Sequence, residues 1–99
     1  MAVVYVSEFN AIGGTGNFNV VSAQQPSITD QTIAIGGGSV QSAAFNTNTN
    51  YVRVHTDAIC SIKFGSNPTV SAANARLAAS ATEYFVVVPG QKLAVITNT

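Results

Sequence analysis

Two neighbouring segments of the chain alternate apolar and polar side chains, and this alternation constrains the fold more than any other feature. The first segment reads YVRVHT (51–56) and the second reads ICSIKF (59–64). Successive side chains of a β-strand point to opposite faces, so the pattern predicts two strands that each bury one face. The buried face is expected to contain Val52, Val54, Cys60, Ile62 and Phe64.

The short stretch between these segments suggests that they form a hairpin. If Thr56-Asp57-Ala58 is a loop, His55 pairs with Ile59, and every other apolar side chain then falls on the same face. A shift of one residue would move those side chains to the opposite face, so the pattern favours this register. The other face then carries four residues, which we interpret either as a protein-contact patch or as an ordinary solvated face: Tyr51, Arg53, His55 and Lys63.

The segment Tyr84–Val88 is continuously apolar, and Leu93–Ile96 is nearly so. Strands that are apolar on both faces must be covered on both faces. In a chain of 99 residues we expect the second cover to be another protein, which makes three residues candidates for contact: Tyr84, Val86 and Val88. Between the two runs, Pro89-Gly90 suits a type II turn within a somewhat longer hairpin loop.

The composition points to a single domain (1–99) that works inside an assembly. Charged residues make up 8% of the chain, against roughly 25% in an average soluble domain, and the net charge is zero. A nucleic-acid partner requires clustered cations, which four scattered Lys and Arg residues do not supply. A neutral monomer has little electrostatic protection against association, so the composition favours a protein that stays packed against others.

The remaining strand candidates are short and separated by turns rich in Gly, Asn and Pro. They include Ala2–Val6, Phe18–Val21 and Ser27–Ile35, and the loop Ile12–Asn17 lies between the first two. This spacing predicts an all-β fold: a single antiparallel β-sandwich or jelly-roll-like domain. Residues 1–10 are interpreted as an N-terminal arm or an edge strand. Only Ala72–Ser80 favours a helix, of one or two turns.

No arrangement of residues indicates catalysis, a cofactor or a metal. Gly13–Gly16 and Gly36–Gly38 lack the residues that phosphate-binding loops require. His55 and Asp57 lie two positions apart, but no nucleophile motif accompanies them. The single cysteine, Cys60, can form no intrachain disulfide and is interpreted as a buried strand residue. We therefore expect no enzyme, no cofactor and no small-molecule substrate.

The N-terminus shows no signal peptide, and no stretch approaches the roughly 18 apolar residues of a spanning helix. The expectation is a protein made and kept in a reducing cytoplasm, or in a particle assembled there, with no membrane partner.

The segment Ala58–Ile96 resembles a pattern found in small structural proteins of tailed bacteriophages. The residues that carry the resemblance are Phe64-Gly65, Asn67-Pro68-Thr69, Arg76-Leu77, Glu83-Tyr84-Phe85 and Pro89-Gly90-Gln91. The resemblance implies a non-enzymatic virion subunit, most like a capsid decoration (cement) protein. Its partner would be the major capsid protein, it would form a homo-oligomer, and it would lie on the capsid surface after assembly in the host cytoplasm.

Two other interpretations remain open. The second is another virion part, such as a head–tail connector or a tail or fibre component. A third interpretation is a small carbohydrate-binding β-sandwich. Sugar sites usually stack the ligand on exposed aromatic rings, and the chain has no Trp and three Tyr residues.

Overall fold

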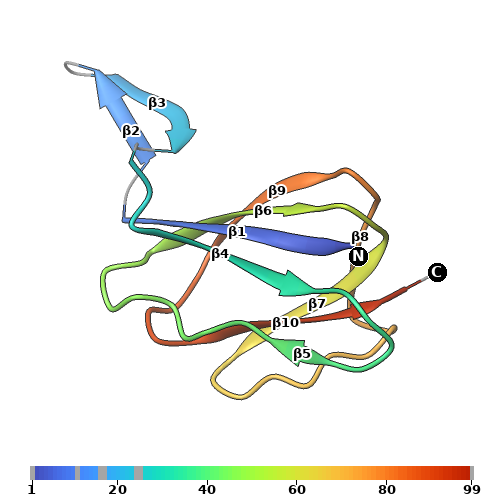
Figure 1. The fold of residues 1–99 in the computed structure, drawn as a ribbon. Coiled ribbons are helices and arrows are strands. Elements are labelled where there is room, and N and C mark those ends of the chain that lie inside the picture. The colour runs from blue at the N-terminus through green and yellow to red at the C-terminus, as the bar shows by residue number, and fades with distance from the viewer. Residues whose placement is uncertain (1, 11, 16–17, 24–25, 99) are drawn as a thin grey trace.

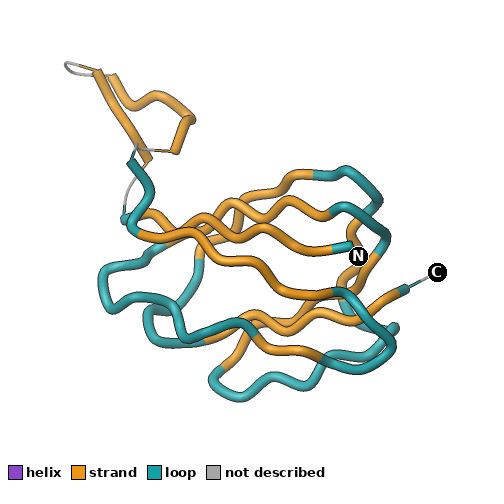
Figure 2. The backbone as a smooth tube through the Cα atoms, in the orientation of Figure 1, coloured by secondary structure: helices purple, strands orange, loops and turns teal. Residues whose placement is uncertain are grey.

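The computed structural model describes residues 2–10, 12–15, 18–23 and 26–98. This part of the chain contains strands joined by loops and no helix (Figure 2). The strands are β1 (Val3–Phe9), β2 (Ile12–Thr15), β3 (Phe18–Ala23), β4 (Thr29–Ala34), β5 (Val40–Gln41), β6 (Tyr51–Thr56), β7 (Cys60–Gly65), β8 (Ala75–Leu77), β9 (Thr82–Val86) and β10 (Lys92–Thr97).

Eight of these strands form two antiparallel sheets that pack face to face. Sheet I has the order β4-β1-β6-β9, and sheet II has the order β5-β10-β7-β8. The remaining strands, β2 and β3, form a separate hairpin that stands off from one end of the sandwich (Figure 1). The predicted all-β sandwich of antiparallel strands is therefore confirmed.

Strand β1 lies inside sheet I, so the expectation of an N-terminal arm or edge strand is wrong. It pairs with β4 on one side and with β6 on the other. The reason is its own alternation, since Val4 and Val6 point into the core and are fully buried while Tyr5 points outward. A strand with one fully apolar face is stabilised most when a neighbouring strand on each side extends that apolar face, because its side chains are then covered on both sides.

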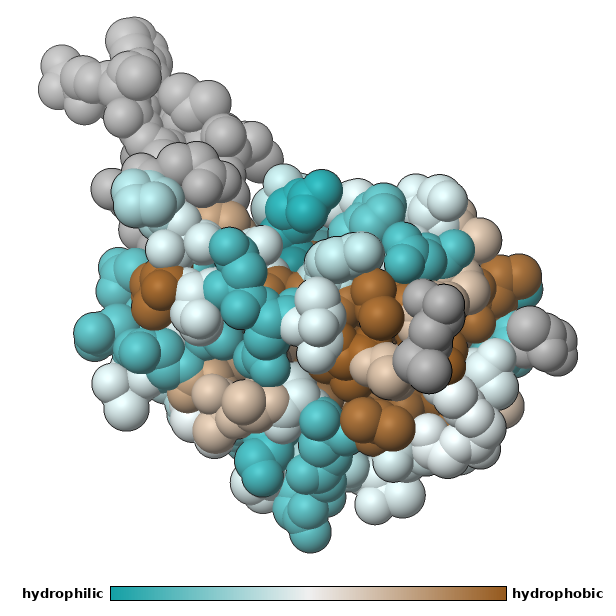
Figure 3. All heavy atoms as spheres, viewed as in Figure 1, coloured by the Kyte–Doolittle hydropathy of each residue, from teal (hydrophilic) through white to brown (hydrophobic). Residues whose placement is uncertain are grey.

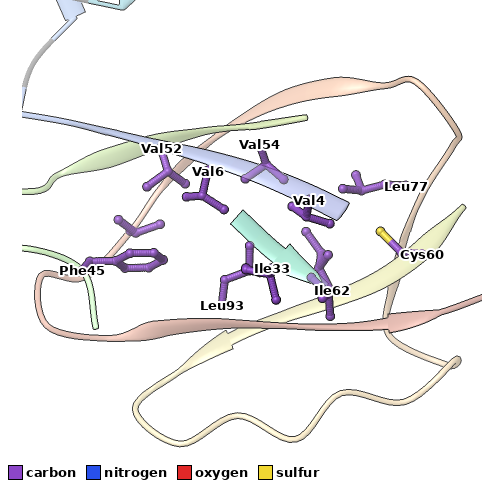
Figure 4. Packing of buried hydrophobic residues seen from close by; sticks show 12 residues of the cluster. Val4, Val6, Ile33, Phe45, Val52, Val54, Cys60, Ile62, Leu77 and Leu93 are labelled. Carbon is purple, nitrogen blue, oxygen red and sulfur yellow. The ribbon is translucent and has the colours of Figure 1, made fainter. Parts of the chain in front are cut away.

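The predicted buried face is largely confirmed. Val52, Val54, Cys60 and Ile62 lie in the core between the sheets (Figure 4). Phe64 is partly buried at the border of this cluster, where its ring lies 5.2 Å from that of Phe85.

The predicted hairpin between these segments is wrong. Strand β6 pairs with β1 and β9 in sheet I, whereas β7 pairs with β10 and β8 in sheet II. A local turn takes the chain across: the Thr56 hydroxyl donates to the Ala58 carbonyl at 2.6 Å and accepts from its N–H at 3.3 Å. Periodicity determines which face a strand buries, and that face is buried equally well when the two strands oppose each other across the core.

The Pro89-Gly90 turn has the expected type and joins the two expected strands, but these strands do not pair with each other. The N–H of Gln91 donates to the carbonyl of Val88 at 3.2 Å, and Gly90 has a φ of +84°, as the third residue of a type II turn requires. The turn leads from β9 in sheet I to β10 in sheet II, so it closes no hairpin.

Two local expectations are also wrong. The segment Ala72–Ser80 contains strand β8 instead of a helix, because Leu77 is buried opposite Cys60. Part of the expected loop 12–17 is strand β2, and residues 16–17 lie outside the described residues.

A buried carboxylate connects three parts of the sandwich. Glu8 on β1 is 1% exposed and accepts hydrogen bonds from the Thr49 hydroxyl (2.7 Å), the Asn46 N–H (2.8 Å) and the Gln31 amide (3.1 Å). We call these four residues the Glu8 network. Gln31 lies on β4, and the other two lie on the segment that leads from sheet II to sheet I. The network therefore fixes this crossing segment against sheet I.

Replacing Glu8 by Ala should lower the free energy of unfolding by about 3 kcal/mol, because the buried Thr49 hydroxyl and two partly buried donors lose their acceptor. Urea unfolding of the purified protein measures this. The control is Glu83→Ala, which removes an exposed carboxylate and should change stability by less than about 0.5 kcal/mol. Equal effects of the two substitutions would contradict a structural role for the network.

Truncation of Phe64 to Ala should cost about 3 kcal/mol, at the lower end of the range for Phe because the ring is only partly buried. Lys63→Ala, on the same strand but exposed, should have almost no effect on the urea midpoint. A loss below about 1 kcal/mol for Phe64→Ala would show that this face contributes little to the core.

Candidate functional site

The outer face of sheet I carries a group of polar and aromatic side chains that could bind a ligand. Cross-strand pairing places them in rows: Tyr5 lies beside His55, and Ser7 lies beside Arg53. On the β4 side, Asp30 pairs with Ser7, so the carboxylate and the guanidinium flank the same serine. On the β9 side, Tyr84 continues the second row next to Arg53.

These rows border a shallow, open hollow of about 390 Å³. The Tyr5 and His55 rings lie 6.2 Å apart on its floor, and Tyr5 is 44% exposed. Within the described residues, the Arg53 guanidinium has no hydrogen-bond or ion-pair partner, whereas one oxygen of Asp30 accepts from the Ser27 hydroxyl at 2.9 Å. The lining residues are Tyr5, Ser7, Asp30, Gln31, Thr32, Arg53 and His55. This set can bind a small polar ligand through a ring face, a cation and a carboxylate.

The hollow shows no arrangement for nucleophilic catalysis. The His55 Nδ1 atom lies 2.8 Å from the Thr82 hydroxyl on β9. Asp57 instead accepts a hydrogen bond from the Val3 N–H at 3.4 Å, so the two residues that suggested a triad have different partners. Within the described part of the chain, no group of three His, Cys, Asp or Glu side chains could hold a metal ion.

The four-residue contact patch expected from the sequence does not form as one surface. Arg53 and His55 are half-buried on the outer face of sheet I, but Tyr51 is 7% exposed and stacks on Phe9 at 5.4 Å. Lys63 is exposed on β7 in sheet II. The error has the same origin as the wrong hairpin, because that pairing had placed Lys63 beside β6.

The apolar run at β9 separates into a covered and an uncovered side. Phe85 packs against the core and Val87 is buried. The residues that alternate with them are exposed: Tyr84 by 55%, Val86 by 91% and Val88 by 57%. We call Tyr84, Val86 and Val88 the β9 apolar edge. The sequence predicted a need for cover on both sides. Among the residues that the structure describes, the second side is largely uncovered at Val86, while the Tyr84 ring lies 6.5 Å from that of Tyr51.

The described residues of the two glycine-rich segments, Gly13–Gly16 and Gly36–Gly38, contribute to strands and turns. Gly13 and Gly14 belong to strand β2, and Gly16 lies outside the described residues. The carbonyl of Gly36 accepts a hydrogen bond from the Thr97 N–H at 2.9 Å, which ties the turn after β4 to β10. In the described residues, no helix has the length and apolar character to cross a membrane.

Comparison with known proteins gives no match to a protein-family model, a curated protein or a solved structure. The hollow was missed in the sequence because Tyr5, Ser7 and Asp30 come from β1 and β4, whose neighbours could not be inferred. The alternation of Val4, Tyr5 and Val6 was the available signal, since it places Tyr5 on the outer face.

Cys60 should react with thiol reagents about 100-fold more slowly in the native protein than in urea, since reaction requires the buried strand to open. The side chain is fully buried, and burial raises the pKa of its thiol above the ordinary value of a cysteine, partly offset by the hydrogen bond to the Thr56 hydroxyl. Absorbance-monitored labelling at pH 8 measures the rate. Native labelling at the rate of the unfolded chain would contradict this burial.

Proposed function

We propose that this chain is a non-enzymatic structural subunit of a tailed-phage particle that binds the capsid lattice as a decoration (cement) protein. It would act as a homo-oligomer on the major capsid protein at the capsid surface. The resemblance of Ala58–Ile96 to small phage structural proteins supports this proposal, as do the two-sheet fold and the scarcity of charge.

The observation that carries the proposal is the β9 apolar edge. Val86 is 91% exposed on an edge strand, in a protein with 8% charged residues. Such an edge is a template for association with another chain. A neutral protein lacks the clustered charge that steers partners over long distances, so its binding rests on apolar burial and backbone hydrogen bonds.

A closed capsid offers many equivalent sites, and this repetition explains how modest contacts hold the protein. Each engaged site raises the effective concentration for the next one within the same oligomer. Contacts of this kind are weakly screened by salt, in contrast to ion pairs between exposed groups.

Particles that lack the protein should release DNA at a lower temperature than complete particles, and re-addition of the purified protein should restore the difference. Affinity should change little between about 0.05 and 0.5 M salt, although the Debye length falls severalfold over that range. A fluorescent DNA-binding dye during a thermal ramp gives the first measurement, and co-sedimentation with particles gives the second.

Equal release temperatures with and without the protein would contradict the cement function. Labelled protein located only at the tail vertex would favour the head–tail connector, tail or fibre alternative instead.

The hollow on sheet I supports a second candidate function, carbohydrate binding. It combines an exposed tyrosine ring with Arg53, Asp30 and hydroxyl groups, which is chemistry that suits a sugar. Binding on a glycan array that is lost in Tyr5→Ala and kept in Tyr84→Ala would support this function. No binding, or binding unaffected by Tyr5→Ala, would exclude it at this hollow.

A further inference from the structure

Within the described residues, strand β9 has a paired neighbour on one side only, β6, and its other side is an open edge of sheet I. In an antiparallel pair, residues alternate between facing the neighbour and facing away. The Val87 N–H donates to Asn50 at 2.9 Å, and the Ala81 carbonyl accepts from Thr56 at 3.1 Å, so the odd-numbered residues 81–87 face β6. Thr82, Tyr84 and Val86 therefore direct their N–H and C=O groups to the open edge of sheet I.

The other sheet edges are protected in ways that β9 is not. Strand β5 has two residues, and β8 has three, including the cation Arg76. On β4, the Gln31 side chain accepts from the Ala43 N–H at 2.9 Å, which holds a loop beside the strand. Natural proteins shield edges by shortness, charge and cover. Strand β9 has five residues without Lys or Pro, and Glu83 is its only charge.

We propose that β9 pairs with β9 of a second copy of this chain, antiparallel, about a two-fold axis that passes beside Tyr84. Tyr84 then lies opposite the partner's Tyr84, and Thr82 lies opposite the partner's Val86. The two copies of sheet I become one continuous sheet. The inference deepens the homo-oligomer in the proposed function and rests on that function for its biological setting, although the pairing itself requires no capsid.

A second copy fits this edge because the edge is self-complementary in that register. Every outward N–H and C=O of β9 meets an outward group of the other strand. Glu83 lies opposite the partner's Phe85, so the two carboxylates are not opposed, and like charges directly opposite would destabilise the pair. The net charge of zero adds no long-range repulsion between copies.

The same pairing also brings side chains of the β9 apolar edge into contact with the partner. In this register the two Tyr84 residues have Cβ atoms about 5.5 Å apart, within reach of an aromatic pair. Val86, which is 91% exposed in the single chain, is brought beside the partner's Thr82. A single strand pair buries less than the roughly 1,200–2,000 Å² of a standard interface. We therefore expect a reversible dimer with a Kd of about 10–100 µM.

Sedimentation of the full chain from about 1 µM to 1 mM should show a monomer–dimer equilibrium in this range. Val86→Lys should remain monomeric throughout, because a lysine at this exposed position leaves the fold intact but charges the edge. The matched control is Val40→Lys, a 40% exposed valine on β5. Apolar surface gathers between the end of β4 and β5 (Figure 3), which makes this the competing site. The control should dimerise normally.

The register is tested by single cysteine substitutions under mild oxidation. Tyr84→Cys should form a disulfide-linked dimer, because the axis places the residue opposite itself at a Cα separation of about 5.5 Å. Thr82→Cys should not, because the two cysteines would lie four residues apart along the strand, or about 13 Å. The native Cys60 is buried and provides the background rate. Equal cross-linking, or faster cross-linking at position 82, would contradict the register.

A monomer at all concentrations, or a dimer lost in Val40→Lys and kept in Val86→Lys, would overturn the inference. A monomer that still binds capsids and raises their DNA-release temperature would overturn the inference alone. A β9-paired dimer that binds no capsid would instead overturn the proposed function and leave the inference standing.

Discussion

The hydrogen bonds to the Glu8 carboxylate are the interaction on which the rest of the structure depends. A carboxylate enclosed in a small sandwich is tolerated only when donors satisfy it, and here Gln31, Asn46 and Thr49 do so. Because these donors come from β4 and from the segment that crosses between the sheets, the network fixes where β6 enters sheet I. With β6 in place between β1 and β9, strand β9 becomes the last strand of its sheet. The exposed apolar edge therefore follows from the way the core is closed.

Two surfaces on which a function can be built lie side by side on the outer face of sheet I. The hollow between Tyr5 and Arg53 is polar, whereas the β9 apolar edge, which continues the row of Arg53 at Tyr84, is a strip of valine and tyrosine beside open backbone groups. A chain with few charged residues has little electrostatic repulsion to oppose association through such an apolar strip. Pairing with a second copy satisfies the backbone groups and covers part of the strip, and the outer face of the joined sheet stays available for a larger partner. Decoration of a repeated lattice would use both properties.

The sequence predicted the fold class and the buried faces but not the neighbours of each strand. Alternation around Val54 and Ile62 reports which side chains face the core, and this information is local. Whether β6 and β7 pair or oppose each other depends on the turn that Thr56 makes with Ala58, and the same alternation fits both arrangements.

The Glu8 network was not foreseen because its donors lie up to 41 positions away along the chain, with no local signal. The hollow was missed for the same reason, since its residues come together only through strand order. By contrast, the need to cover the run Tyr84–Val88 was visible in the sequence, because the run is continuously apolar and a chain of 99 residues has too little interior to cover both of its sides.

Residue-resolved amide hydrogen exchange, measured by NMR at low and at high protein concentration, tests the open and self-pairing edge most directly. In dilute solution the amides of Thr82, Tyr84 and Val86 should exchange rapidly, while those of Glu83, Phe85 and Val87, which face β6, should be protected. On concentration the first three should become protected, and the amides of the other edge strands should not change. Rapid exchange at residues 82, 84 and 86 at every concentration would contradict the account, as would new protection confined to β4, β5 or β8.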